Sequence, residues 1–313
     1  IGIELRLDEN VTAIDTCKQE VHTGTGCVLR YDRLVLATGA GVRRLDVPGT
    51  ALRGIHYLRD INDSLLLRDG LRRAKRLLVI GAGFISLEVA SAARKLGVEV
   101  VVIEMQPTIL ARVVDSGIAG VIQLIHESHG VEFRTGRQVS AILGTGDVTG
   151  VQLDAGERFG ADMVVIGIGI IPEEGLAVQA GLRVDNGIVV NEYGETSDPC
   201  VLAVGDVCNY QSVLYGRRLR LESWQNAEDQ SAHVARVICG DREPYLNVPW
   251  FWSDQYDINL QMAGICDGHE RSVRRIYNHL NELCEFYLSN DVLVAAVAVN
   301  RPRDIAVARK LIG

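Results

Sequence analysis

The turn Gly81-Ala82-Gly83 constrains this chain more than any other feature of its sequence. It follows an apolar run at 77–80 and precedes a helix predicted over 84–96, and a second apolar run follows at 98–103. Glycines lack Cβ, so they allow a tight turn and a close approach of another group to the backbone. A strand, a glycine turn and a helix in this order predict a βαβ unit whose helix N-terminus binds the pyrophosphate of a dinucleotide.

Two further residues of this unit refine the prediction. Ser86 occupies the third position of the glycine pattern, and a small side chain there still lets the helix pack on the strand. The second strand ends at Glu104, 23 residues after Gly81. A carboxylate at this position accepts hydrogen bonds from ribose hydroxyls and repels a 2′-phosphate, so the sequence favours NADH over NADPH. The alternative is a tight turn without a ligand.

The first turns of the same helix supply three more candidates. Phe84 and Ile85 begin the helix, and we expect them at the dinucleotide. Glu88 lies one helical turn further on, and we expect it to face the nicotinamide end. The alternative for Glu88 is an ordinary solvated helix residue.

Composition excludes several classes of protein. The formal net charge is -8 at pH 7, which argues against a nucleic-acid-binding surface. Seven scattered cysteines without a CxxC pair favour reduced thiols and a cytoplasmic protein. No apolar run has the roughly 20 residues needed to span a membrane, and we find no signal peptide. The seven histidines show no metal-ligand spacing.

Hydrophobic patterns along the rest of the chain predict alternating strands and helices, and therefore a parallel sheet. No internal repeat is apparent, and the sequence starts at Ile1 in a strand-like stretch, as if inside a domain. The predicted strands span residues 1–7, 28–37, 163–171 and 201–204, with antiparallel strands over 283–299; the predicted helices span 61–74, 118–129, 222–237 and 303–312.

Six short motifs in a fixed order carry a family resemblance. They are the segments 34–40, 81–88, 167–172, 197–206, 222–227 and 249–255. Together they resemble the FAD-dependent ferredoxin reductases of oxygenase systems, the relatives of rubredoxin and putidaredoxin reductases, and the resemblance covers essentially the whole chain. It implies an α/β fold with two Rossmann-like domains, one for FAD and an inserted one for NAD, plus a small α+β C-terminal reductase domain. The implied bounds are 1–74 with 197–247 for FAD, 75–196 for NAD and 248–313 for the reductase domain.

The resemblance also implies roles for single residues. Thr38 and Gly39 correspond to the crossover into the FAD domain, Asp206 to the acid that holds the ribityl or phosphate region, and Trp252 to an aromatic that the C-terminal domain brings to the flavin. The remaining FAD candidates are Arg43, Glu222, Ser223 and Trp224. For NAD, the resemblance adds Arg112 near the adenosine and Gly167, Ile168 and Gly169 near the nicotinamide. Thr108 stands where the family often has another arginine. For Arg43, Asp206 and Trp252 the alternatives are a surface charge, a turn residue and a core residue.

One departure concerns the FAD pyrophosphate. The family begins with its own GxGxxG, whereas here only Gly24-Thr25-Gly26 precedes Thr38, in a hairpin-like setting. We therefore expect this sequence to be a piece of a longer FAD protein, and whether the piece retains FAD is open.

The implied reaction is hydride transfer from NADH to flavin, followed by single-electron transfer to a ferredoxin or rubredoxin. The cofactor carries this chemistry, so no catalytic side chain is certain. The lack of a close cysteine pair excludes disulfide-reductase chemistry within this sequence. The alternatives are an NADH oxidase, a nitrite-reductase-type flavoprotein, and a non-enzymatic NAD-binding flavoprotein resembling apoptosis-inducing factors.

A basic patch in the C-terminal domain is a candidate docking site for an acidic ferredoxin. The alternative is a set of ordinary surface arginines. The arginines of this patch are Arg271, Arg274, Arg275, Arg301 and Arg303.

Overall fold

The structure is a computed structural model that describes residues 2–277, 279 and 281–312. The chain forms two compact units. Unit 1 contains residues 1–41 and 171–249, and unit 2 contains residues 42–170 and 250–313. These bounds differ from those expected for the two cofactor domains. Residues 42–74 belong to unit 2, together with the glycine turn, and residues 171–196 belong to unit 1. The reason is pairing: β6 (Ile55–His56) joins the central sheet of unit 2.

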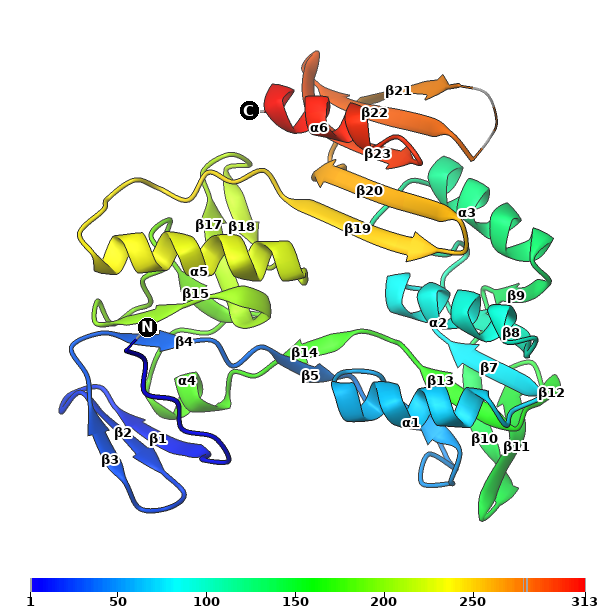
Figure 1. Cartoon of the computed structure of the whole chain (residues 1–313), viewed down its shortest axis with the longest axis horizontal. Helices are drawn as coiled ribbons and strands as arrows, with labels where there is room; N and C mark the ends of the chain where they lie inside the picture. Colours follow the sequence, from blue (N-terminus) through cyan, green and yellow to red (C-terminus); the bar gives the residue numbers. More distant parts are fainter. Residues whose placement is uncertain (1, 278, 280, 313) are drawn as a thin grey trace. The chain divides into compact units, whose positions relative to one another are not determined.

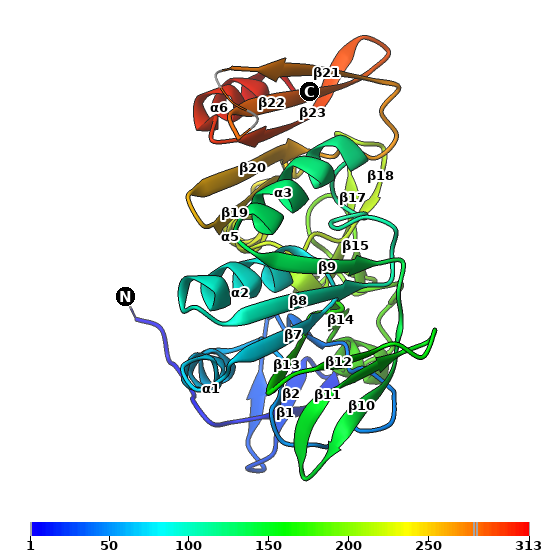
Figure 2. The same ribbon diagram turned by 90° about the vertical axis from the view of Figure 1, so that its right-hand side faces the viewer.

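Unit 2 is built on a five-stranded parallel sheet in the order β6-β13-β7-β8-β9, of which Figure 2 labels β13, β7, β8 and β9. Its inner strands β13, β7 and β8 are largely apolar and buried, as expected for a parallel sheet covered on both faces, whereas the edge strands β6 and β9 are only partly buried. Three helices accompany it, α1 (Ile61–Leu71), α2 (Phe84–Lys95) and α3 (Ser116–Ser128). The remaining strands of the sheet are β7 (Arg76–Ile80), β8 (Glu99–Glu104), β9 (Val131–Thr135) and β13 (Met163–Ile166).

Helix starts in unit 2 follow their capping residues. Asp60 and Asp63 form a capping box at α1, and Asp115 caps α3 through the backbone N–H groups of Gly117 and Ile118. At α2 the N-cap is Gly83, and no side chain caps it. The orphan N–H groups of α2 are therefore left for another partner.

The C-terminal part of unit 2 is an antiparallel sheet, as the sequence predicts for 283–299. Its order is β19-β20-β23-β22-β21, and α6 (Pro302–Leu311) packs on β20 and β23 (Figure 1). Its strands are β19 (Trp250–Gln255), β20 (Ile258–Gly264), β21 (Arg271–Ile276), β22 (Leu283–Ser289) and β23 (Val292–Val299).

Unit 1 contains a short parallel pair, β4 (Leu34–Leu36) and β16 (Val201–Ala203), followed by the 3-10 turn η1 (Gly205–Val207). Helix α5 (Trp224–Ile238) packs against η1, and α4 (Gly175–Gln179) contacts β1. A three-stranded sheet in the order β15-β17-β18 accompanies them, and β5 pairs with β14 where the chain passes between the units. These strands are β15 (Ile188–Val190), β17 (Cys208–Ser212), β18 (Arg217–Leu219), β5 (Ala40–Val42) and β14 (Ile170–Pro172).

Three strand predictions are wrong. The strand predicted over 28–37 breaks at residues 31–33 into β3 (Val28–Arg30) and β4, which belong to different sheets. Residues 2–10 form no strand, and Ile3, Leu5 and Leu7 are exposed, because an alternating pattern makes a strand only when a neighbouring strand pairs with it; residue 1 lies outside the described residues. The strand predicted over 163–171 breaks after Ile166, because Gly169 (φ +107) turns the chain from β13 into β14.

The two units share a repeated element that the sequence reading missed. In unit 1, β1 (Val11–Asp15), β2 (Glu20–Thr23) and β3 (Val28–Arg30) form an antiparallel sheet that leads into β4. In unit 2, β10 (Val139–Thr145), β11 (Asp147–Leu153) and β12 (Arg158–Gly160) do the same before β13. The sequences agree as well: GIELR at 2–6 matches GVEFR at 130–134, and VTAI at 11–14 matches VSAI at 139–142. The repeat confirms two related nucleotide-domain-like units in an α/β chain.

Among the described residues, no helix is both long and apolar enough to cross a membrane.

Candidate functional site

The glycine turn joins β7 to α2 at the carboxyl end of the parallel sheet. Gly81 has φ +94, and a Cβ there would lie 2.3 Å from the carbonyl oxygen of Gly167. At Gly83 an added Cβ would meet nothing within 4 Å, so the backbone is open on that side. Gly81 is therefore required by the fold, whereas Gly83 leaves room for a ligand at the uncapped end of α2.

The first two residues of α2 differ in environment. The ring of Phe84 packs on Phe251 of β19, with 4.5 Å between ring centroids. Ile85 is 49% exposed although it is apolar, at the helix N-terminus that carries the orphan N–H groups. A nucleotide bound at this helix end would cover apolar surface that is otherwise in water.

Glu104 lies at the end of β8, where an acceptor for the ribose is expected, and it also holds the glycine turn by a hydrogen bond. Its Oε2 accepts from the backbone N–H of Ala82 at 2.7 Å, and its Oε1 accepts from the N–H of Gln106 at 2.7 Å. A carboxylate has lone pairs for about four hydrogen bonds, so acceptor capacity remains for ribose hydroxyls. The sequence did not indicate the link to Ala82, since it forms between residues 22 apart.

The segment Gly167-Ile168-Gly169 continues from β13, next to β7 in the sheet. A Cβ on Gly167 would lie 2.2 Å from Ser86 Oγ. Serine can therefore replace the third glycine of the GxGxxG pattern only because residue 167 is a glycine. Arg112 is exposed, and its Nη2 lies 3.6 Å from where a Cβ on Gly169 would be. This geometry places the Arg112 guanidinium beside Gly169, in the segment expected at the nicotinamide.

Glu88 is half-buried on α2 and is not an ordinary solvated residue. Burial raises the pKa of its carboxyl, a hydrogen bond from Ser253 Oγ opposes that shift, and the charge of Asp254 adds to it. The Ser253 Oγ–Glu88 Oε1 distance is 2.5 Å. Carboxyls with raised pKa values cluster at functional sites, which supports its place among the candidates.

The FAD candidates of unit 1 lie at one edge of the β4–β16 pair. Leu36 pairs with Ala203, so the segments with Thr38-Gly39 and with Gly205-Asp206 follow neighbouring strands at the same end. Carboxyl ends of parallel strands are where α/β folds bind ligands. Thr38 Oγ1 donates to the carbonyl of Glu173 at 2.8 Å, and Gly205, with φ +77, is held by Gln230 Oε1.

The segment 222–224 begins α5 and packs near η1. Ser223 is the N-cap, and its Oγ accepts from the N–H of Asn226 at 3.2 Å. Glu222 forms an ion pair with Arg220 at 2.8 Å, and Trp224 is 63% exposed. A large, mostly exposed indole at a helix N-terminus presents apolar surface that an aromatic ligand would cover.

Two of the FAD candidates belong to unit 2. Arg43 is exposed, and its backbone N–H donates to the carbonyl of Gly169 at 2.9 Å. Trp252 is half-buried and stacks on Trp250 with 4.9 Å between centroids.

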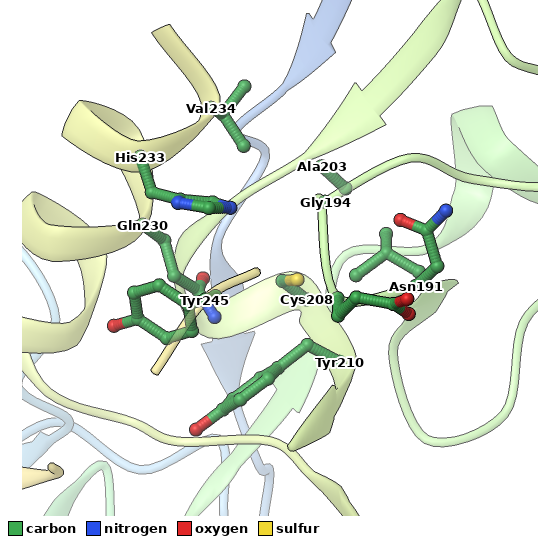
Figure 3. Close-up of a pocket in the computed structure, with 11 residues that line it drawn as sticks. Asn191, Gly194, Ala203, Cys208, Tyr210, Gln230, His233, Val234 and Tyr245 are labelled. Atoms are coloured by element: carbon green, nitrogen blue, oxygen red, sulfur yellow. The ribbon is translucent and has the colours of Figure 1, made fainter. Parts of the chain in front are cut away.

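A cavity in unit 1 is too small for a cofactor. It measures about 10 Å³, and Figure 3 shows Gln230 and His233 directed towards Cys208 and Tyr210. Gln230 Nε2 and His233 Nε2 are buried and have no hydrogen-bond partner among the residues that the structure describes. A cavity of this size with two such groups fits one water molecule.

Cysteine and metal chemistry find no support in the described part of the chain. All seven cysteines are free, and no group of three metal-ligating side chains occurs among the described residues. Burial raises the pKa values of the Cys208 and Cys284 thiols to about 12, so both are protonated at neutral pH.

Comparison with known families decides what this architecture is. The model described as pyridine nucleotide-disulphide oxidoreductase matches residues 1–231, and the model described as reductase C-terminal matches residues 250–313. The chain belongs to the pyridine nucleotide-disulphide oxidoreductase family. With its C-terminal reductase domain, it falls among the ferredoxin reductases of that family, which confirms the resemblance carried by the six motifs.

Named relatives agree along almost the whole chain. Putidaredoxin reductase CamA of Pseudomonas putida is 40% identical over 99% of this chain and 75% of its own length. The ferredoxin–NAD(+) reductase component of the anthranilate 1,2-dioxygenase system of Burkholderia cepacia is 42% identical over 99% of this chain and 77% of its own. The ferredoxin reductase for the CYP199A2 system of Rhodopseudomonas palustris has a solved structure that superposes with a TM-score of 0.94, at 38% identity, over 97% of this chain and 76% of its own.

Proposed function

We propose that this chain is an NADH-dependent, FAD-containing reductase that passes electrons singly to a ferredoxin or rubredoxin of an oxygenase system. The observation that carries the proposal is the uncapped N-terminus of α2 behind Gly81 and Gly83, with the Glu104 carboxylate at the end of the next strand. The relatives are named reductases of putidaredoxin, rubredoxin and ferredoxin, and one solved relative is a covalent putidaredoxin reductase–putidaredoxin complex.

The residues of unit 2 fit a dinucleotide. We propose that the N–H groups of Phe84 and Ile85 bind the pyrophosphate, and that Glu104 accepts from the adenosine ribose. The nicotinamide then lies towards Gly167-Ile168-Gly169 and Arg112, on the β13 side of the turn. Glu88, one turn inside α2, is the titratable group that we assign to the nicotinamide end.

The residues of unit 1 fit FAD in part. Thr38, Gly39 and Asp206 supply polar groups at the carboxyl ends of β4 and β16, and Glu222, Ser223 and Trp224 supply a helix start with an exposed indole. The sequence holds no second glycine-rich turn for the FAD pyrophosphate. Bound FAD would supply the two-electron to one-electron conversion that no side chain can. We assign Arg43 and Trp252 to the same cofactor on the family resemblance.

Three of the five arginines in the basic patch already pair with carboxylates. Arg271 pairs with Asp291 at 2.9 Å, Arg301 pairs with Glu282 at 3.0 Å, and Arg274 is bound to the buried Glu285. A guanidinium that is already paired contributes little to the attraction of an acidic partner. We therefore propose Arg275 and Arg303 as the docking arginines. We also propose a cytoplasmic location, because all seven cysteines are free thiols.

The test is electron transfer to a defined acceptor. The protein, supplied with FAD, is mixed with NADH and a [2Fe–2S] ferredoxin in the absence of oxygen, and ferredoxin reduction is followed by its absorbance. The proposal predicts ferredoxin reduction that depends on NADH and FAD. Oxygen consumption without any protein acceptor, at a rate that ferredoxin does not change, would overturn it in favour of an NADH oxidase.

A further inference from the structure

A chain of hydrogen bonds ties the carboxyl of Glu88 to helix α3 through β19. Ser253 Oγ lies 2.5 Å from Glu88 Oε1, and Gln255 Nε2 donates to Ser253 Oγ at 3.0 Å. Gln255 Oε1 lies 2.7 Å from His126 Nε2, and His126 Nδ1 is 3.4 Å from the Tyr256 hydroxyl. All of these residues belong to unit 2.

The three middle residues of this hydrogen-bonded series are buried. Ser253 is 1% exposed, and Gln255 and His126 are both 0% exposed. A buried polar network is stable only when each member is satisfied, so the donors and acceptors must follow one consistent order.

That order has a single direction when Glu88 is ionised. A carboxylate only accepts, so the Ser253 hydroxyl must donate to it and must itself accept from the amide of Gln255. Gln255 then presents its carbonyl oxygen to α3, and His126 must carry its proton on Nε2. Each donor from His126 to Ser253 therefore donates in the direction of Glu88. Burial prevents the Gln255 amide from exchanging the positions of its oxygen and nitrogen.

The same face of α2 is bound to the end of β19 at two further points. Ser91 Oγ accepts from the backbone N–H of Tyr256 at 2.8 Å, and Lys95 Nζ donates to the carbonyl oxygen of Tyr256 at 3.1 Å. Glu88, Ser91 and Lys95 are three and four residues apart and share this face of the helix. The hairpin end is therefore fixed on α2, and Ser253 cannot follow Glu88 if that side chain changes rotamer.

The two oxygens of Glu88 are consequently unequal. Oε1 is occupied by Ser253, while Oε2 has no hydrogen bond within the described part of the chain. The charge of Asp254 acts on Glu88, His129 acts on His126, and the charge of Arg94 acts on Tyr256, whose carbonyl oxygen also accepts from Lys95.

We propose that His126, Gln255 and Ser253 form a positioning relay that holds Glu88 with Oε1 occupied and Oε2 available to the nicotinamide end of bound NADH. This inference rests on the proposed NADH site and adds residues that touch no cofactor. His126 acts through Glu88, so it is a positioning residue, and its effect on the nucleotide must vanish when Glu88 is absent.

A double-mutant cycle on the whole protein tests the relay. The ligand is 1,4,5,6-tetrahydro-NAD, which resembles NADH but transfers no hydride, and the readout is its Kd by calorimetry. We expect His126→Phe to raise the Kd about 10-fold, the effect of one hydrogen bond to a charged group. In a Glu88→Ala background the same change should alter the Kd less than about 2-fold.

Two companion variants separate the relay from general packing. His126→Gln keeps a donor near the Nε2 position, so it should restore the Kd to within about 2-fold of the original value. His129→Phe, one turn away and exposed, should leave the Kd unchanged. Equal effects of His126→Phe in both Glu88 backgrounds would overturn the relay.

The unaltered protein gives a second, independent test. The ¹⁵N chemical shifts of the His126 imidazole should show the neutral Nε2–H tautomer at pH 7, and an Nδ1–H tautomer would overturn the direction of the chain. Failure of the unaltered protein to bind the analogue at all would count against the proposed NADH site, whereas normal binding with an additive cycle would count against the relay alone.

Discussion

At the scale of single residues, two glycines beside the proposed site are required for different reasons. A Cβ at Gly81 would strike the backbone of Gly167, which cannot move aside, and the φ of +94 adds strain. A Cβ at Gly167 would strike the side chain of Ser86, which substitution can remove. The glycine pattern was predictable from the sequence, but the dependence of Ser86 on Gly167 was not, because the two residues are distant in the chain.

This difference predicts which glycine substitution can be rescued. Gly167→Ala should lower the free energy of unfolding by about 1–3 kcal/mol, the usual cost of overpacking. Measured against Ser86→Gly alone, the double variant Ser86→Gly/Gly167→Ala should recover most of that loss. Gly81→Ala should stay destabilised in the Ser86→Gly background. Urea denaturation measures all of these, and a Gly167→Ala loss that persists without Ser86 would contradict the packing argument.

Glu104 has two roles that one variant can expose. Glu104→Ala removes the acceptor for the N–H groups of Ala82 and Gln106, so it should cost about 1–2 kcal/mol of stability. It also removes the charge that repels a 2′-phosphate, so the ratio of kcat/KM for NADPH to that for NADH should rise about 10-fold.

The matched control for Glu104 is Glu99→Ala on the same strand. Glu99 forms an exposed ion pair with Arg76, which is worth about 0–1 kcal/mol. Its loss should not alter the choice between nucleotides. A selectivity change of similar size at Glu99 would mean that the nucleotide senses overall charge and not the Glu104 position.

The buried His126 should give stability a measurable pH dependence. Burial lowers the pKa of its imidazole below the usual 6.5, so the unfolded chain binds a proton more readily than the folded one. This contribution is present above pH 6.5 and is lost as pH falls through the folded pKa. Glu88 has the opposite sign, because its raised pKa favours the folded state below pH 4.5 and that contribution is lost as pH rises.

Denaturation between pH 5 and pH 7.5 separates the two groups. His126→Gln should flatten the loss of stability towards pH 5, and Glu88→Gln should steepen the gain towards pH 7.5. His56 and His233, whose pKa values burial also lowers, should keep part of the slope in both variants. An unchanged slope in His126→Gln would mean that His126 titrates alike in both states.

At the scale of elements, the sequence predicts those whose signals are local. The βαβ unit, every helix except α4 and the antiparallel strands β22 and β23 were predicted from apolar periodicity, with ends that differ by a few residues. Helix α5, for example, begins at Trp224, two residues later than the predicted start at 222, with Ser223 as its N-cap. The strand predicted over 1–7 is wrong for residues 2–7, because no neighbouring strand pairs with this alternating segment. The contact of Ser253 with Glu88 could not be predicted either, since it joins segments 165 residues apart.

Strand β21 carries the prediction about the acceptor. Its side chains are exposed along its whole length, but Arg274 is tied to Glu285, so reversing its charge would disturb the sheet. Arg275→Glu should slow ferredoxin reduction about 10-fold at low salt, with little change for ferricyanide. Arg68→Glu on α1 is the control with the same charge change, and equal slowing there would show that only net charge matters.

At the scale of the whole molecule, two related units follow from one repeated pattern. Each contains a three-stranded antiparallel sheet that leads into a buried parallel strand, which is β4 in unit 1 and β13 in unit 2. Among the described residues, only unit 2 contains a complete glycine turn with a glutamate at the end of the next strand. We therefore assign NADH to unit 2 and the flavin contacts to unit 1.

The assignment of NADH to the turn of unit 2 is tested most directly by an anaerobic titration. The protein is supplied with FAD, the flavin absorbance is recorded, and NADH or NADPH is added in equal steps without oxygen. We predict that NADH bleaches the flavin band at near-stoichiometric amounts, while NADPH does so only at much higher concentration. A flavin that NADH leaves oxidised, or that both nucleotides reduce equally well, would contradict the account.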